Sequence, residues 1–258
     1  MSEIKVSLES GVCTLTLNRP EVFNSFNRTM ALSLQKELDA AERNDEVRAI
    51  VIIGEGKAFC AGQDLAEATD PEGPELQTIV RDHYNPIIAR IRTIEKPIIA
   101  AVNGVAAGAG ANIALACDIT IARKSASFIQ AFSKIGLIPD SGGTFFLPRI
   151  VGMQKALALM MTGDKVSADD AVALNMIYKA VEDDSFESEV NTFAQIIASM
   201  PTRGLGLTKK AVNMSFSNDL SQQLALEEDL QTEAGMTYDF REGVNAFLEK
   251  RKPVFKGE

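Results

Sequence analysis

The sequence predicts an α/β fold, and three observations support it. Strand-like and helix-like segments alternate over the first two thirds of the 258 residues. The run Arg48–Ile53 is apolar at consecutive positions, which is typical of a strand covered by helices on both faces. Helical patterns dominate the last third. We therefore expect an α/β core over residues 1–200 and a helical region over residues 201–258 that belongs to the same functional unit.

The first elements follow from local patterns. Residues 4–8 and 12–17 alternate apolar and polar side chains around Ser10-Gly11, which predicts a hairpin. Apolar side chains then recur at helical spacing from Arg28 to Arg43, so we expect a helix there.

Further helices and strands are expected along the middle and the end of the chain. Residues 76–94 have helical spacing, and Pro86 predicts a bend within that helix. The remaining expected strands are residues 98–102, 118–122, 127–129 and 177–181. The remaining expected helices are residues 111–116, 142–150, 152–162, a short one after Ser167, residues 186–200 and most of residues 204–258.

Composition excludes several classes of function. The net charge of −9 argues against nucleic-acid binding through a broad basic face, so we expect no nucleic-acid partner. No apolar run is long enough to span a bilayer, and the N-terminus has no signal-peptide pattern. Cys13, Cys60 and Cys117 are odd in number and widely spaced, which suggests neither a metal site nor a disulfide framework. We expect a cytoplasmic protein with no metal.

Three runs rich in small residues stand out as a candidate site: Lys57–Asp64, Asn103–Asn112 and Gly136–Gly143. The first two follow apolar strands, and their small side chains would let backbone N–H groups approach a ligand closely. Two such donors can stabilise a thioester oxygen that gains negative charge. The alternative is that both runs are tight turns between packed elements.

The chain resembles the crotonase family, that is, the enoyl-CoA hydratase/isomerase superfamily. The matching runs are Thr14–Pro20, Lys57–Leu65, Ala100–Ala111, Cys117–Ile121 and Tyr238–Arg251. The resemblance implies a crotonase-like ββα spiral with a helical C-terminal trimerisation region, assembled as a homotrimer or a dimer of trimers. It also implies an acyl-CoA substrate and no further cofactor, since CoA is part of the substrate.

The resemblance assigns roles to residues of the first two runs. The backbone N–H groups of Gln63 and Ala109 correspond to the family's oxyanion hole. Cys60, Ala61 and Gln63 would line the path of the adenine and the pantetheine. Lys250, near the charged C-terminus, would contact CoA phosphates, including those of a neighbouring subunit.

Departures from the family pattern bear on the reaction. Hydratases of the family carry two glutamates, and the matching positions here hold Asn112 and Phe132, which we expect to line the substrate site. Neither side chain can act as a base, which disfavours hydration. One carboxylate, Asp140, remains, and a single acid/base group is sufficient for an isomerisation.

Asp140 has a plainer interpretation as the N-cap of the helix that follows it. Its apolar neighbours would raise its pKa and the helix N-terminus would lower it, and the sequence leaves the balance open. We expect an acyl-CoA isomerase that uses Asp140. The alternatives are an enoyl-CoA hydratase with water held at Asn112, and a catalytically silent partner that binds acyl-CoA.

Overall fold

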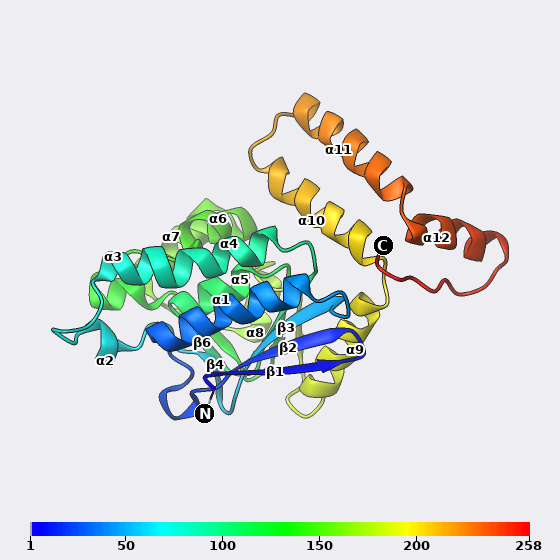
Figure 1. The fold of residues 1–258 in the computed structure, drawn as a ribbon. Coiled ribbons are helices and arrows are strands. Elements are labelled where there is room, and N and C mark those ends of the chain that lie inside the picture. Colours follow the sequence, from blue (N-terminus) through cyan, green and yellow to red (C-terminus); the bar gives the residue numbers. More distant parts are fainter. Residues whose placement is uncertain (1) are drawn as a thin grey trace.

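The computed structural model describes residues 2–258, and its core contains two β-sheets (Figure 1). The larger sheet has the strand order β1-β2-β3-β5-β7-β10, and the smaller has the order β4-β6-β8-β9. The strands of the larger sheet are β1 (Ile4–Glu9), β2 (Val12–Leu17), β3 (Ala49–Gly54), β5 (Ile98–Val102), β7 (Ile119–Arg123) and β10 (Lys179–Val181). Those of the smaller sheet are β4 (Ala58–Cys60), β6 (Val105–Ala107), β8 (Ser127–Ile129) and β9 (Lys165–Ser167).

The chain passes repeatedly from the larger sheet to the smaller one and then into helices. β3 is followed by β4, β5 by β6, and β7 by β8, and helical segments follow each of these pairs. β1 and β2 form the expected antiparallel hairpin, while β2, β3, β5, β7 and β10 pair in parallel. The ββα spiral is confirmed. The second sheet was not predicted as a sheet, because strands of three residues carry almost no periodicity.

Helices cover both faces of the larger sheet. In β3, Ile50 and Ile52 join the cluster that includes α1 (Arg28–Arg43), α4 (Asn85–Thr93) and α5 (Ala109–Ala116). Ala49 and Val51 pack on the opposite face with α9 (Phe186–Ala198). The consecutive apolar residues of this strand are explained by burial on both sides.

The helical repeat changes just before Pro86, where a bend was expected. α3 (Leu76–Thr78) leads into a π-helical segment, η2 (Ile79–Tyr84), before α4 begins. Pro86 has no N–H for the carbonyl of Asp82, four residues earlier. The Gln35 side chain on α1 supplies the missing donor, with Nε2 bonded to the carbonyls of Asp82 (2.8 Å) and His83 (3.1 Å).

The remaining helices connect the core or extend from it. Those in the core are η1 (Pro20–Val22), α2 (Leu65–Ala68), η3 (Ala131–Ile135), α6 (Gly143–Val151), α7 (Met153–Thr162) and α8 (Ala168–Ala173). Three more, α10 (Thr202–Ser215), α11 (Leu220–Gly235) and α12 (Tyr238–Leu248), form an arm that projects from the core in Figure 1. Within residues 2–258, no helix is both long enough and apolar enough to cross a membrane.

Candidate active site

The three small-residue runs meet at one edge of the smaller sheet. β4, β6 and β8 are parallel neighbours, and each leads into one of the runs or toward it. The carboxyl ends of parallel strands lie at the same edge of a sheet, so the segments that follow them converge. The Gly108 N–H also donates to the carbonyl of Ile129 at the end of β8 (2.9 Å), and this bond joins the second run to β8.

The first run presents an unpaired backbone donor at Gln63. Phe26 pairs with this segment in parallel: its N–H donates to the Gly62 carbonyl (2.7 Å) and its carbonyl accepts from the Asp64 N–H (2.8 Å). Successive peptide groups of an extended chain point in opposite directions, so the Gln63 N–H points away from Phe26. It donates to no group within residues 2–258.

The second run presents a similar donor at Ala109, the first residue of α5. Gly108 precedes it with φ 54° and ψ −127°, a conformation that essentially only glycine adopts. The Ala109 N–H is one of the unpaired donors of a helix N-terminus, and it bonds to no other part of the described chain. A Cβ placed on Gly62 would lie 3.5 Å from the Ala109 nitrogen, so the two loops touch.

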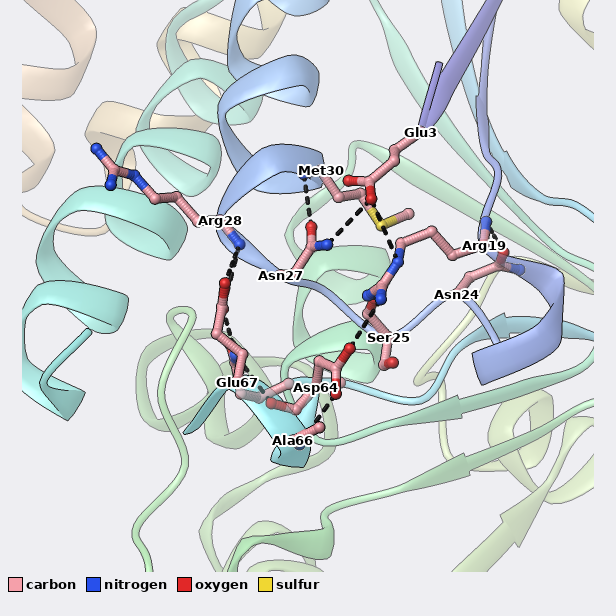
Figure 2. Close-up of polar contacts among 12 residues, drawn as sticks. Glu3, Arg19, Asn24, Ser25, Asn27, Arg28, Met30, Asp64, Ala66 and Glu67 are labelled. Atoms are coloured by element: carbon pink, nitrogen blue, oxygen red, sulfur yellow. Dashed lines mark hydrogen bonds and ion pairs between the residues drawn. The ribbon is translucent and has the colours of Figure 1, made fainter. Parts of the chain in front are cut away.

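Charged groups fix the base of the first loop (Figure 2). Arg19 bonds to the Asp64 carboxylate (2.8 Å) and to the Ser25 carbonyl (2.6 Å). The Glu67 carboxylate accepts from the Arg28 N–H at the start of α1 (2.9 and 3.1 Å). The donor at Gln63 is therefore carried on a segment held on both sides.

Tyr84 holds the Gln63 side chain, and it was not predicted as a site residue. Its hydroxyl donates to Gln63 Oε1 (2.9 Å), and its ring packs edge-on against Phe26. Burial first, then the nearby Cys60 and Asp140, raise the pKa of Tyr84 well above its ordinary value. Tyr84 ends the π-helical segment, and π-turns are frequent at functional sites. The only sequence signal was Pro86, two residues later.

Asp140 opens a tight turn rather than capping α6. Its carbonyl accepts from the Gly143 N–H (2.8 Å), and the two residues between them, Ser141 and Gly142, have φ of 50° and 73°. Two positive φ values define a type I′ turn. α6 has Gly142 as its N-cap with no side-chain cap bond, so the alternative N-cap interpretation is wrong.

Burial has the largest effect on the pKa of the Asp140 carboxyl group. It raises the pKa of Asp140 above the ordinary value, and hydrogen bonds from the Ser141 hydroxyl (2.9 Å) and from its own backbone oppose the rise only in part. No charged group within residues 2–258 contributes to this shift. A carboxyl group with a raised pKa is suited to both accepting and returning a proton.

Asn112 and Phe132, at the two glutamate positions, are buried. Asn112 is fully buried: Nδ2 donates to the Asp140 carbonyl (2.8 Å), and Oδ1 accepts from Gln130 Nε2 (2.8 Å). The structure thus places Asn112 beneath the Asp140 turn instead of open to a ligand. Phe132 lies beside the second loop, with its Cζ 3.9 Å from where a Gly108 Cβ would be.

The other predicted residues differ in their surroundings. Cys60 is fully buried, burial raises the pKa of its thiol to about 12, and its Sγ accepts from the Gly62 N–H of the first loop (3.4 Å). Ala61 is exposed next to it. Lys250 is exposed just after α12, and Figure 1 places that helix far from α5 and α6 of the same chain.

The described part of the chain brings together no cluster of three or more His, Cys, Asp or Glu side chains suited to a metal.

Comparisons with known proteins agree with this geometry. The family model described as enoyl-CoA hydratase/isomerase matches residues 7–258. The chain is 48% identical to the 1,2-epoxyphenylacetyl-CoA isomerase of Escherichia coli (strain K12), with 100% of both chains covered. It is 37% identical to the trans-2-decenoyl-(acyl-carrier-protein) isomerase of Streptococcus mutans serotype c, covering 99% of this chain and 98% of that protein.

Solved structures give the same result. An enoyl-CoA hydratase from Bacillus anthracis superimposes with a TM-score of 0.93 at 33% identity, covering 99% of this chain and 100% of that one. An enoyl-CoA hydratase from Polaromonas sp. JS666 gives a TM-score of 0.91 at 37% identity, covering 98% and 99%. Each comparison extends over nearly the whole chain.

Proposed function

The chain belongs to the enoyl-CoA hydratase/isomerase (crotonase) family, and we propose that it is an acyl-CoA isomerase with Asp140 as its only acid/base group. The observation that carries this proposal is the setting of Asp140. It is a partly buried carboxyl with a raised pKa on a turn bonded to α5, the helix whose first N–H is one of two unpaired donors.

In the proposed reaction, the thioester oxygen accepts hydrogen bonds from the N–H groups of Gln63 and Ala109. The Asp140 carboxylate removes a proton from the α carbon, and the electron pair moves onto the thioester oxygen to form a dienolate. Removing one such donor from an oxyanion site costs about 2.7–4 kcal/mol in known enzymes. The protonated Asp140 then returns the proton at the γ carbon, so that a 3-enoyl thioester becomes a 2-enoyl thioester with no net change in composition.

Hydration needs a different set of groups. A hydratase must position a water molecule and move its proton, which in this family is the work of two carboxylates. Here Asn112 is bonded on both sides and Phe132 is apolar and buried. These two positions favour isomerisation over hydration.

The physiological substrate we propose is the ring epoxide of phenylacetyl-CoA, 2-(1,2-epoxy-1,2-dihydrophenyl)acetyl-CoA, which the enzyme would convert to oxepin-CoA in phenylacetate degradation. The 48% identity to a 1,2-epoxyphenylacetyl-CoA isomerase supports this choice. The name of the Streptococcus mutans relative supports the accompanying double-bond isomerisation. We further propose a homotrimer or dimer of trimers, with the arm of α10–α12 in the contact.

The test is a panel of 3-enoyl-CoA, 2-enoyl-CoA and enzymatically generated epoxyphenylacetyl-CoA, offered to the wild type, to Asp140→Asn and to Asp164→Asn. Asp164 is an exposed carboxylate outside the site and serves as the matched control. We expect Asp140→Asn to fold and to bind acyl-CoA, and to lose roughly 10²–10⁴-fold in isomerase turnover. Products are followed by ultraviolet absorbance and mass spectrometry.

Three results would contradict the proposal. Near-wild-type turnover in Asp140→Asn would remove Asp140 from the mechanism. Conversion of crotonyl-CoA to its 3-hydroxy product as the dominant activity would indicate a hydratase. Thermal stabilisation by acyl-CoA without turnover of any thioester in the panel would indicate a catalytically silent binding protein.

A further inference from the structure

Two buried side-chain amides form a chain of hydrogen bonds that ends on the backbone of Asp140. Gln130 Nε2 donates to Asn112 Oδ1 (2.8 Å), and Asn112 Nδ2 donates to the Asp140 carbonyl (2.8 Å). Gln130 is 2% exposed and Asn112 is 0% exposed. A buried amide loses free energy when its hydrogen-bonding groups stay unpaired. The nitrogen and the oxygen of the Asn112 amide are both bonded, whereas Gln130 Oε1 has no partner within residues 2–258.

The polarity of the chain is set at its Asp140 end. A carbonyl oxygen only accepts, so Asn112 must present its NH₂ group to Asp140 and its oxygen to Gln130. Flipping the Asn112 amide would place two acceptors against each other at Asp140. The arrangement therefore requires an amide at position 112, since a glutamate or aspartate carboxylate has no hydrogen to donate.

The turn that receives this bond needs external support. Ser141 is a non-glycine residue at φ 50°, a conformation that costs free energy and persists when surrounding contacts impose it. The Asp140 carbonyl accepts from both Asn112 and the Gly143 N–H, and a Cβ on Gly143 would overlap the Asn112 amide. The turn is thus packed directly against the Asn112 side chain.

Asn112 also links the two halves of the site. It lies three residues after Ala109 on α5, so a single rigid helix carries the Ala109 N–H and the amide that holds the Asp140 turn. The relative position of the proposed donor and the proposed base then depends on one helix rather than on two independent loops.

We propose that Asn112 and Gln130 are positioning residues that hold Asp140 at its working distance from the Ala109 donor without adding charge beside it. This inference rests on the proposed function, in which Asp140 is the acid/base group. Asn112 acts through the Asp140 backbone, and Gln130 acts through Asn112.

The experiment compares Asn112→Asp, Asn112→Ala and Gln130→Leu with Thr120→Val in the full-length protein, using a 3-enoyl-CoA substrate. Thr120 is the matched control because it is also buried and its hydroxyl donates to the carbonyl of Ala114 on the same helix, away from Asp140. Unfolding midpoints, kcat, KM and pH profiles are measured for each variant.

We expect Asn112→Ala to lower kcat by roughly 10²-fold, the size of a 1 Å misplacement, while KM changes little. Asn112→Asp keeps the shape of the side chain but puts a negative charge beside Asp140. A like charge raises the pKa of a carboxyl group, so the acidic limb of its pH profile should move to higher pH. Gln130→Leu should have a smaller effect of the same kind. Thr120→Val should lose comparable stability with kcat and the pH profile unchanged.

The outcomes separate this inference from the proposed function. If Asp140→Asn is inactive but the Asn112 variants keep wild-type kcat and pH dependence, the positioning role is wrong and the proposed function stands. Activity losses in the Asn112 variants no larger than in Thr120→Val at equal stability would indicate a merely structural role. If Asp140→Asn is active, the proposed function itself fails. In the Asp140→Asn background, Asn112→Ala should cause no further loss of turnover.

Discussion

The two sides of the site are held in place by different chemistry. On the Gln63 side, the loop is fixed by charged groups: Arg19 bonds to Asp64, and Glu67 caps the start of α1. On the Asp140 side, the turn is fixed by neutral amides of Asn112 and Gln130. Both arrangements provide rigidity, and they differ in the electric field they leave behind.

The difference matches what each side has to do in the proposed reaction. A backbone N–H needs only a fixed direction, and its own protonation state does not change, so ion pairs nearby do no harm. A proton-transferring carboxyl group needs a pKa nearer to the working pH. An arginine beside Asp140 would lower its pKa, whereas neutral amides leave the effect of burial in place. We infer that charged neighbours are compatible with the Gln63 donor but not with the Asp140 acid/base group.

The largest loss of stability in this comparison is expected from breaking the charged side. Arg19→Met removes a partly buried partner from Asp64, and charged hydrogen bonds of this kind contribute about 1.5–3 kcal/mol. We expect the free energy of unfolding to fall by that amount and turnover to fall roughly tenfold, because the Gln63 donor loses its support. Denaturant unfolding and kcat measure the two effects.

Lys5→Met is the control for that variant, because Lys5 forms an exposed ion pair with Glu55 (3.1 Å). Exposed pairs contribute about 0–1 kcal/mol, so Lys5→Met should be close to wild type in both measurements. If Arg19→Met proved as mild as Lys5→Met, the ion pair between Arg19 and Asp64 (Figure 2) would have no special part in holding the Gln63 loop.

A smaller effect is expected from Ser141 on the neutral side. Its hydroxyl donates to the Asp140 carboxylate and holds the pKa of Asp140 below the value that burial alone would give. In Ser141→Ala the pKa of Asp140 should rise, so the acidic limb of kcat/KM should move to higher pH. Stability should fall by about 0.5–1.5 kcal/mol.

Ser141→Gly also lacks the hydroxyl, but it relieves the positive φ at this position. It should therefore show the same pH shift with a smaller loss of stability. An unshifted acidic limb in both variants would mean that the hydroxyl does not act on the titrating group.

The smallest expected effect is a gain in stability on removing the Asp140 charge. Because the folded-state pKa of Asp140 is raised above 3.8, the folded protein binds this proton more tightly than the unfolded chain. Stability is therefore lost as pH rises from about 3.8 through the folded-state pKa, and the penalty is constant above it. Asp140→Asn should raise Tm at pH 7 by about 1–4 °C.

The gain should shrink as the pH is lowered through the folded-state pKa of Asp140, because the wild-type carboxyl then takes up its proton. Differential scanning calorimetry between pH 7 and pH 4.5 measures it, with Asp164→Asn as the exposed control. A lower Tm for Asp140→Asn at pH 7 would mean that this carboxylate is stabilising and that burial does not dominate its pKa.

Much of this protein could be predicted from its sequence, because the relevant information is local. The periodicity of Arg28–Arg43 located α1 to the residue, and the consecutive apolar side chains of β3 predicted burial on both faces. The small residues around Gln63 and Ala109, together with the family resemblance and the single carboxylate at Asp140, led to the prediction of the candidate site.

Other features depended on contacts between residues far apart in the chain. The smaller sheet brings the three loops together, yet its strands are only three residues long, and residues 127–129 alone among them were expected as a strand. The balance of influences on Asp140 was decided by burial, and burial is a property of the packed molecule. Asn112 was expected to face the substrate, and only the positions of Gln130 and the Asp140 carbonyl revealed its contacts. Sequence specifies which groups are present, whereas packing decides which of them remain free to react.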